Sequence, residues 1–375
     1  MTVFETHNGD FALRGGGLGA DLITLQDIRQ CDAAPPRLGD GGYFYGDLWK
    51  VHQRSSFVFG CLCNLDFSIL CHQLPHLTLL QYLYDGLSPG TVRFGSKVNA
   101  LANGNISRPS LIVDGIEEDF AFLVAADGGW SNFRNKYVEP GKQPVYAGYV
   151  LFRGLVDTIH VPRFNSWGFH GRGQIMTGGY MVRGPSDEAM ANVGLYVAVP
   201  SDAAAAEAPG QRFEGRQIVS SSHLQPAWFV PLVQSLFGSD WAGLWSAVAS
   251  FGKFSPHPVY EYSAHTAVAG RVLLLGDAAH MASPNTGSGA RAAFADALSL
   301  RSCLVESFTS SGGHDAAAKI DAALQAYNID TVDRGRQLLQ LSHHVSHRYI
   351  PGTQELLLIE RLAQKAALEA GQLPV

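Results

Sequence analysis

The pattern of apolar and polar positions marks one segment, Gly270 to Ala297, as a strand followed by a turn and a helix. Its first part, Arg271 to Leu275, is a short and mainly apolar run closed by a glycine, which is the pattern of a buried strand. From Ala290 the chain is rich in alanine and leucine, which favour helix. Open α/β sheets bind ligands at the carboxyl ends of their strands, so Asp277, directly after this strand, is a candidate binding residue.

The same periodicities predict a mixed α/β (α+β) fold for the rest of the chain. A second apolar run, Phe120 to Ala126, ends at an Asp-Gly pair, and a third, Met1 to Glu5, ends at an acidic residue. Aromatic and polar residues alternate over 43–70 and 146–262, as in strands, with one helix expected after Pro226. Helical periodicity marks 74–87 and 315–349.

The composition is that of a globular protein with a large core. The 375 residues are 46% hydrophobic and 16% charged, which gives no sign of disorder. A formal net charge of -6 argues against a nucleic-acid partner, because such binding needs a basic face. The longest apolar candidate, Phe57 to Cys71, is too short and too polar for a membrane span. Five cysteines without a disulfide pattern and no secretory signal predict reduced thiols and a cytoplasmic location.

Between the strand and the helix lies a turn that a proline opens and two glycines close. A helix begins there with unpaired N–H groups and the positive end of its dipole, which suits an anionic or electron-rich ligand. The candidate cofactor-binding residues of this segment are Gly276, Asp277, Pro284, Gly287, Ser288, Gly289 and Ala290.

This segment resembles the second flavin motif of the FAD-dependent aromatic hydroxylases, the para-hydroxybenzoate hydroxylase-like monooxygenases. The shared letters are G-D-A-A-H, a proline, G-x-G, and an Asp-Ala pair in the helix, here Asp296 and Ala297. The resemblance implies that Asp277 holds the ribityl chain of FAD and that Pro284 and the G-x-G turn lie against the isoalloxazine ring. The residue after G-x-G-x is commonly asparagine in the family but is Arg291 here, and the 2,6-dihydroxypyridine hydroxylase-like branch also lacks that asparagine.

Two further stretches resemble the same family. Its A-D-G-x-x-S-x-x-R pattern is matched from Ala126 to Arg134, which implies contacts of Asp127 and Gly128 with the FAD pyrophosphate and with the nicotinamide nucleotide. Arg134 is a candidate phosphate ligand, because a guanidinium fork binds such oxygens bidentately. The stretch from Tyr146 to Gly154 resembles the Y-A-G-Y-x-x-x-R-G strand that leads into the substrate domain.

The N-terminal part departs from the family. Glu5 ends a strand, where dinucleotide folds carry the acidic residue that binds the adenosine ribose, but no G-x-G-x-x-G stretch precedes it in these 375 residues. Gly15 to Ala20 fits the pattern G-x-G-x-x-A, but it does not follow directly on a strand, as a phosphate-binding loop would. In the family that the chain resembles, a glycine-rich stretch at this place lies near the flavin. Arg14 beside it is a candidate FAD contact. We expect these 375 residues alone to bind FAD weakly, because each buried group that a missing central strand leaves unpaired costs about 1–3 kcal/mol.

The resemblance covers residues 5 to about 335 and implies two interleaved domains. An FAD/NAD(P)-binding Rossmann-like domain is expected from 1–30, 71–145 and 263–340, and a mainly β substrate domain from 31–70 and 146–262, with a helical segment at 341–375. The implied reaction is hydroxylation of an aromatic or N-heteroaromatic ring, with FAD, NAD(P)H and O2, through a flavin C4a-hydroperoxide. The partners would be a small aromatic substrate and O2.

Two alternatives remain open. One is an N-terminally truncated relative that binds FAD poorly and acts as a non-catalytic binding protein. The other is different flavin chemistry, such as epoxidation, halogenation or reduction. A metal is not expected, because the histidines at 343 and 347 lack a third ligand and Cys61 and Cys63 lack zinc-ribbon spacing. The candidate catalytic residues are His280, His170 and Tyr149, and Arg153 and Tyr180 could also face a substrate.

Overall fold

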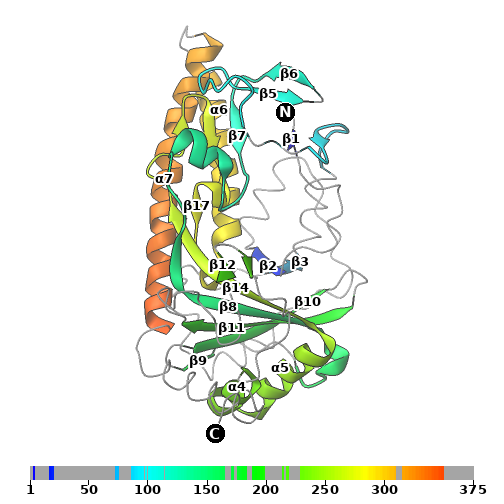
Figure 1. Ribbon diagram of the computed structural model, residues 1–375. Coiled ribbons are helices and arrows are strands. Elements are labelled where there is room, and N and C mark those ends of the chain that lie inside the picture. Colours follow the sequence, from blue (N-terminus) through cyan, green and yellow to red (C-terminus); the bar gives the residue numbers. More distant parts are fainter. Residues whose placement is uncertain are drawn as a thin grey trace.

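A computed structural model describes the chain mainly over residues 86–309 and 315–349 (Figure 1). Short gaps lie at 97, 99, 114, 165–169, 173–174, 184–187, 199–212, 215–216 and 219–228. Before residue 86, the described residues are 3–4, 17–20 and 72–75. Two sheets and four helices organise the described part of the chain.

The larger sheet has six strands, which are β8 (Val145–Asp157), β9 (His170–Arg172), β10 (Ile175–Arg183), β11 (Ala189–Ala198), β14 (Lys253–Ser263) and β17 (His280–Met281). Their order is β17-β14-β8-β11-β10-β9, and every neighbouring pair is antiparallel. Alternate side chains of β8, such as Phe152, are buried on the face that helices α4 (Phe229–Phe237) and α5 (Ser239–Phe251) cover (Figure 1). Trp245 of α5 is fully buried in this core.

Gly154 lies where β8 passes close to α5. A Cβ at Gly154 would stand 2.7 Å from Cγ2 of Val193 and 2.9 Å from Cζ3 of Trp245. Gly154→Ala is therefore expected to destabilise the chain by about 1–3 kcal/mol, the usual effect of overpacking a core. Gly243→Ala is the matched control, because a Cβ on this exposed residue of α5 would have no atom within 4 Å and alanine favours helix by up to about 1 kcal/mol. Urea unfolding compares the two, and equal midpoints would contradict the packing.

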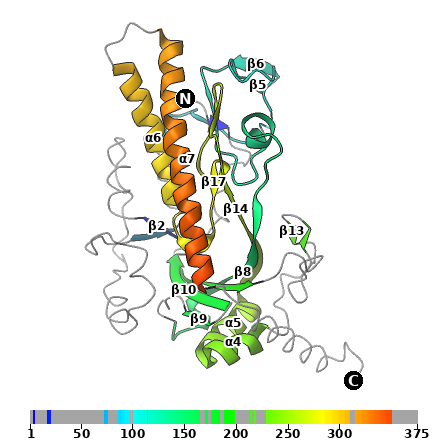
Figure 2. The same cartoon turned by 90° about the vertical axis from the view of Figure 1, so that its left-hand side faces the viewer.

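A smaller sheet has three strands, which are β7 (Leu123–Ala125), β15 (Val268–Ala269) and β16 (Val272–Leu274). The helices α6 (Gly289–Thr309) and α7 (Ala316–Tyr349) lie side by side along it (Figure 2). Leu273 of the sheet and Leu324 and Tyr327 of α7 are fully buried in one cluster. The Tyr327 hydroxyl donates a hydrogen bond to the Leu274 carbonyl at 2.7 Å, so α7 is fixed to the sheet by both apolar and polar contacts.

Shorter elements complete the described residues. The glycine-rich stretch Gly17–Ala20 is a strand paired with His72–Pro75, so its described residues form no strand-turn-helix unit. The helical turns are η1 (Arg134–Val138), η2 (Thr158–His160), η3 (Gly276–Ala278) and η4 (Pro284–Thr286). The remaining strands are β1 (Val3–Phe4), β2 (Gly17–Ala20), β3 (His72–Pro75), β4 (Val92–Arg93), β5 (Ser110–Val113), β6 (Ile116–Asp119), β12 (Phe213–Glu214) and β13 (Gln217–Ile218).

The mixture of helix and sheet agrees with the predicted fold class. The expected strand at 271–275 and helix at 315–349 are present as β16 and α7, and the helix after Pro226 is α4. Helix α5 was not predicted, although its buried residues at 241, 244, 245 and 248 follow a helical spacing. α7 runs without interruption past the domain boundary predicted at 340, and the domain boundaries stay a prediction.

No helix in the described part of the chain combines the length and the apolar character that a membrane span requires. The predicted strands at 43–70 and most of the predicted helix at 74–87 lie outside the described residues.

Candidate functional site

The two strand-to-turn motifs lie side by side. β7 and β16 pair in parallel with Ala125 opposite Leu274, and the Leu275 N–H donates to the Ala125 carbonyl at 3.0 Å. Because parallel strands end at the same edge of a sheet, Asp127 and Asp277 leave the sheet together. Two motifs that are far apart in the sequence therefore form one edge.

Asp277 lies next to the start of α6. Its carboxylate is exposed, and a Cβ on Gly289 would lie 3.9 Å from its Oδ1. Gly287 has a φ of 61°, a left-handed conformation that glycine adopts without strain, and a Cβ there would have open space around it. The neighbouring protein desolvates Asp277 and raises its pKa, and the nearby His280 lowers this pKa in part. A carboxylate, a glycine turn and a helix N-terminus thus lie together beside open space.

Asp127 and Ser131 shape the loop after β7. The Asp127 carboxylate accepts a hydrogen bond from the Asn132 N–H at 2.8 Å, and the Ser131 hydroxyl accepts one from the Arg134 N–H at 2.9 Å. Such contacts satisfy donors that the first turn of a helix leaves unpaired. Gly128, with a φ of 80°, permits the sharp turn between them. This motif therefore has a structural role in starting the helical turn η1.

Arg134 joins the two motifs. Its side chain is fully buried, and its guanidinium donates to the Ala278 carbonyl at 2.8 Å and to the Gly129 carbonyl at 2.6 Å. The guanidinium carbon lies 4.0 Å from the centre of the Tyr262 ring, within range of a cation–π contact. These contacts hold the two loops together, and the predicted contact of Arg134 with phosphate stays a prediction.

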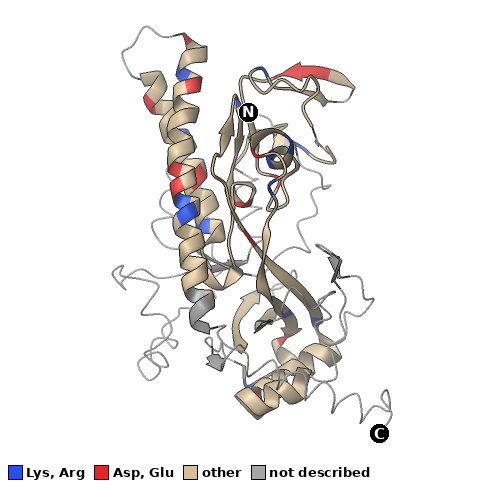
Figure 3. Ribbon diagram, turned by 60° about the vertical axis from the view of Figure 1, so that its left-hand side comes forward, with Lys and Arg blue, Asp and Glu red and all other residues tan. Residues whose placement is uncertain are grey.

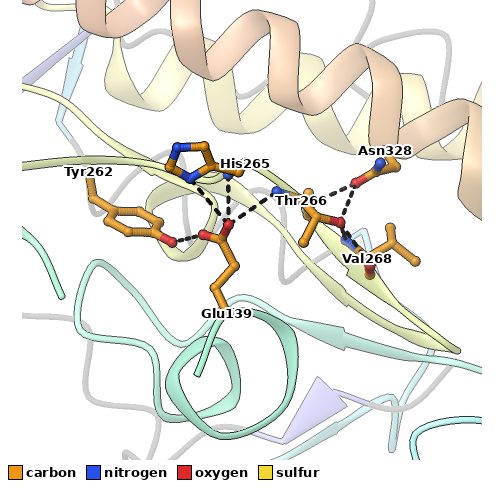
Figure 4. Close-up of polar contacts among 7 residues, drawn as sticks. Glu139, Tyr262, His265, Thr266, Val268 and Asn328 are labelled. Carbon is orange, nitrogen blue, oxygen red and sulfur yellow. Dashed lines mark hydrogen bonds and ion pairs between the residues drawn. The ribbon is translucent and has the colours of Figure 1, made fainter. Parts of the chain in front are cut away.

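Glu139, directly after η1, holds the turn between β14 and β15 (Figure 4). Its buried carboxylate accepts hydrogen bonds from the Tyr262 hydroxyl and from the N–H groups of His265 at 2.9 Å and Thr266 at 3.3 Å. The Thr266 hydroxyl in turn donates to Oδ1 of Asn328 on α7 at 3.2 Å. Hydrogen bonds therefore run from the loop after β7 to the long helix.

Asp296 lies at the centre of a second buried network. This fully buried carboxylate accepts a hydrogen bond at 2.9 Å from the N–H of Gly276, in the turn after β16, and contacts Nε2 of His280, in β17, at 2.7 Å. From α7, the Thr331 hydroxyl donates to it at 3.2 Å, and the Arg334 guanidinium donates as well. Asp296 thus fixes the residues on both sides of Asp277 to two helices.

Tyr149 of β8 connects the six-stranded sheet to the turn before α6. Its buried hydroxyl contacts the Ser283 hydroxyl, lies 3.2 Å from Oγ of Ser346 and accepts a hydrogen bond from Asn285 at 3.5 Å. Burial raises the pKa of Tyr149 to about 12, although the hydrogen bonds to Ser283 and Ser346 lower it in part. The phenol is therefore protonated at neutral pH and can donate a hydrogen bond rather than act as a base.

The predicted site residues fall into three groups. Glu5 and Arg14 lie outside the described residues, and only the backbone of His170 is described, in β9. His280 is buried against Asp296. The structure places the following predicted cofactor residues at the shared sheet edge or in the turn that follows it: Asp127, Gly128, Gly276, Asp277, Pro284, Gly287, Ser288, Gly289 and Ala290. Their cofactor contacts stay predictions.

Metal ligands do not gather in the described residues, where no group of three histidine, cysteine, aspartate or glutamate side chains is placed to hold an ion. His343, on the helix face considered for zinc, pairs with Glu261 at 2.9 Å. Cys61 and Cys63 lie outside the described residues.

Sequence reasoning missed the structural roles of Asp296, Glu139 and Arg334. Asp296 was visible as part of the helical Asp-Ala pair, and an acidic residue within an alanine-rich, mostly apolar helix face is a usable signal for a buried polar network. Glu139 and Arg334 carry no such signal. Their roles depend on contacts with segments far away in the sequence.

The site defines a class of protein. A glycine turn and a helix N-terminus at the carboxyl end of a parallel strand are the usual place where α/β folds bind nucleotide-type ligands. Residues 240–342 match the protein family described as FAD binding domain. The fold resembles that of 2,6-dihydroxypyridine-3-hydroxylase from Arthrobacter nicotinovorans, with a TM-score of 0.62 and 19% identity over 94% of this chain and 87% of that one.

Curated relatives agree with this class. The 6-hydroxynicotinate 3-monooxygenase of Pseudomonas fluorescens is 27% identical over 348 residues, 89% of this chain and 82% of that protein. An FAD-dependent monooxygenase of a Phoma species is 25% identical over 72% of this chain and 62% of its own length. The resemblance to the FAD-dependent aromatic hydroxylase-like monooxygenases is thereby confirmed, as is the FAD-binding α/β fold. The chain spans 39–62% of the length of several other relatives of this kind.

Proposed function

We propose that the chain is an FAD-dependent monooxygenase that hydroxylates a small aromatic or N-heteroaromatic ring, with NAD(P)H as reductant and O2 as oxidant. The observation that carries this proposal is the common edge of β7 and β16, which brings Asp127, Asp277 and the start of α6 together. Tyr149 ties the turn at this edge to the six-stranded sheet. The site can therefore hold a cofactor and a substrate next to each other.

The residues at this edge suit FAD. Asp277 is exposed and free to accept hydrogen bonds from ribityl hydroxyls, and open space lies beside Gly287. The N–H groups at the start of α6 present a positive dipole end to an electron-rich ring. FAD supplies the redox chemistry and the activation of O2 when it is bound, and the chain binds, orients and shields the reactants. The buried network around Asp296 holds the Asp277 turn in place for this purpose.

The names of the relatives support the substrate class. One relative is a 6-hydroxynicotinate monooxygenase, and one similar structure is a dihydroxypyridine hydroxylase, so both are named for small N-heteroaromatic rings. We transfer this class, and the use of NAD(P)H, to the chain as part of the proposal. The relatives are named as enzymes, so they do not favour the alternative of a non-catalytic binding protein.

Asp277→Ala is expected to lower the affinity for FAD about tenfold to a hundredfold, because charge-assisted hydrogen bonds contribute about 1.5–3 kcal/mol. The measurement is the visible absorption spectrum of the purified chain after incubation with FAD and desalting, followed by a titration to obtain Kd. Asp119→Ala is the control, because Asp119 is an exposed residue of β6 away from the site. Equal FAD retention by both variants would contradict the role of Asp277.

The same spectrum of the unaltered chain tests the expectation that these 375 residues hold FAD weakly. Activity is then measured as O2-dependent oxidation of NADH or NADPH in the presence of 6-hydroxynicotinate, 2,6-dihydroxypyridine or salicylate. Incorporation of one atom of 18O from 18O2 into the ring is the expected result. Oxidation of the nicotinamide without labelled product from any ring would contradict a hydroxylase.

A further inference from the structure

The turn η4, which leads into α6, is built on Ser283. The Ser283 hydroxyl accepts a hydrogen bond from the Asn285 N–H at 3.3 Å, and the Ser283 carbonyl accepts one from the Thr286 hydroxyl at 3.1 Å. Ser283 itself is buried, whereas Pro284 and Gly287 in the same stretch are exposed. The position of this exposed turn therefore depends on the groups that hold Ser283.

Two strands of the six-stranded sheet hold Ser283. From β8, the Tyr149 hydroxyl donates a hydrogen bond to the Ser283 hydroxyl. From β14, Glu261 acts through a residue of α7. The Ser283 N–H donates to the Ser342 hydroxyl at 3.0 Å, and the Ser342 hydroxyl donates in turn to the Glu261 carboxylate. Ser342 is fully buried and Glu261 is buried, so water does not replace these contacts freely.

Glu261 fixes the direction of the hydrogen bonds at Ser342. A backbone N–H can only donate and a carboxylate can only accept, whereas a serine hydroxyl can do both. Because Ser342 gives its single hydroxyl proton to Glu261, the lone pairs of its oxygen remain for the Ser283 N–H. Without the carboxylate, the hydroxyl would be free to rotate, and the Ser283 N–H would lose a defined partner.

The second oxygen of Glu261 is also occupied. It lies 2.9 Å from Nε2 of His343, whose side chain is half-exposed. From 337 to 347 the chain has no lysine, arginine, aspartate or glutamate, and Figure 3 shows the charged residues of α7 away from the end beside the large sheet. Burial of a carboxylate is unfavourable when an imidazole is its one charged partner among the described residues. Its presence here favours a specific polar role.

The charge of Glu261 also affects Tyr149. Burial is the main reason why the pKa of Tyr149 is raised to about 12. Hydrogen bonds to Ser283 and Ser346 lower this pKa in part, and the charge of Glu261 raises it further. The phenol therefore stays protonated at neutral pH, which is the form that donates to the Ser283 hydroxyl. Glu261 thus supports both of the hydrogen bonds by which the large sheet holds Ser283.

We propose that Glu261 is a positioning residue of the cofactor site, which fixes Ser283 through Ser342 and Tyr149 and thereby places the turn η4. The proposal rests on the proposed function, because η4 is the turn expected against the isoalloxazine ring of FAD. Glu261 is buried and acts only through these residues. The exposed residues of the turn, Pro284 and Gly287, are the ones available to a bound cofactor.

The first test measures hydrogen exchange of the Ser283 amide by NMR, without FAD. Glu261→Ala is expected to make this exchange about tenfold faster or more, because the hydrogen bond to Ser342 is no longer held in one direction. The Leu274 amide, which donates to the Ala267 carbonyl at 2.8 Å in the small sheet, is the internal reference for global unfolding. His344→Ala is the control, because His344 is exposed beside His343, and it is expected to exchange like the unaltered chain.

The second test separates the hydrogen bond from packing. Ser342→Thr and Ser342→Val add nearly the same volume at a fully buried position, but only threonine keeps the hydroxyl. Ser342→Thr is expected to retain slow exchange of the Ser283 amide, and Ser342→Val to lose it. FAD titration is expected to give a Kd about tenfold higher for Ser342→Val than for Ser342→Thr.

Equal exchange of the Ser283 amide in the threonine and valine variants would overturn the proposal, as would unchanged exchange in Glu261→Ala. Equal affinities for FAD in the two Ser342 variants would overturn the role of this contact in the cofactor site. Faster exchange of Ser283 and Leu274 together would show a loss of global stability instead, and would also count against positioning. Absence of FAD binding by the unaltered chain would count against the proposed function, while the exchange rates still decide whether Glu261 holds the turn.

Discussion

Replacing Asp296 with alanine is expected to remove about 3–5 kcal/mol of stability and to abolish FAD retention. The carboxylate is fully buried and accepts hydrogen bonds from both the turn around Asp277 and α7. Its loss leaves the Arg334 guanidinium without its carboxylate partner, which is the situation in which breaking a buried ion pair is most costly. It also leaves the Gly276 N–H unsatisfied in the interior, so the turn that carries Asp277 loses its support.

Asp296→Asn separates the effect of losing the negative charge from the effect of losing the side chain. The amide keeps the shape and one acceptor oxygen but places an NH2 group against donors, so we expect an intermediate loss of stability. Asp330→Ala is the control, because Asp330 is an exposed residue of α7 that accepts one hydrogen bond from Ser299. Chemical denaturation and FAD titration are measured on all three variants. If Asp296→Ala bound FAD as tightly as Asp330→Ala, the buried network would have no role in the cofactor site.

Glu139→Ala is expected to destabilise the chain by about 3 kcal/mol or more while changing FAD affinity less than Asp296→Ala does. Three donors lose their acceptor, namely the hydroxyl of Tyr262 and the N–H groups of His265 and Thr266. Each buried donor left unsatisfied costs about 1–3 kcal/mol. Glu139 holds the turn between β14 and β15 and does not contact the Asp277 turn directly, so the site is affected only through the loss of stability.

Glu118→Ala provides the comparison for Glu139→Ala. Glu118 pairs with Arg93 at 3.0 Å near the surface, and such exposed pairs contribute about 0–1 kcal/mol. Thermal unfolding of both variants, together with FAD titration below the transition, measures the difference. Equal unfolding temperatures for the two variants would show that water replaces the three hydrogen bonds of Glu139 without loss.

Local sequence predicted the site where one continuous stretch carries all of its parts. Strand, acidic residue, glycine turn and helix start follow each other from 271 to 290, and the structure has them in that order. The parallel pairing of β7 with β16 was not predicted, because the two strands are far apart in the sequence. Long helical periodicity located α7 almost to the residue.

Roles that depend on tertiary contacts could not be predicted from the same sequence. Arg134 has the spacing of a phosphate ligand, yet its burial gives the guanidinium two protein carbonyls as partners. The pairing of Asp296 with Arg334 requires α6 and α7 to lie side by side, which no local pattern encodes. The buried position of Tyr149 likewise depends on the serines that approach it from the turn before α6 and from α7.

The uninterrupted length of α7 has a consequence for how the molecule can move. The whole helix of 34 residues is about 50 Å long. Its stretch from Asn328, beside the small sheet, to Ser346, beside the large one, spans about 27 Å. A hinge between the two sheets would have to break the backbone hydrogen bonds of this helix or pull it away from one of them. We infer that the two sheets keep their relative position when the molecule moves.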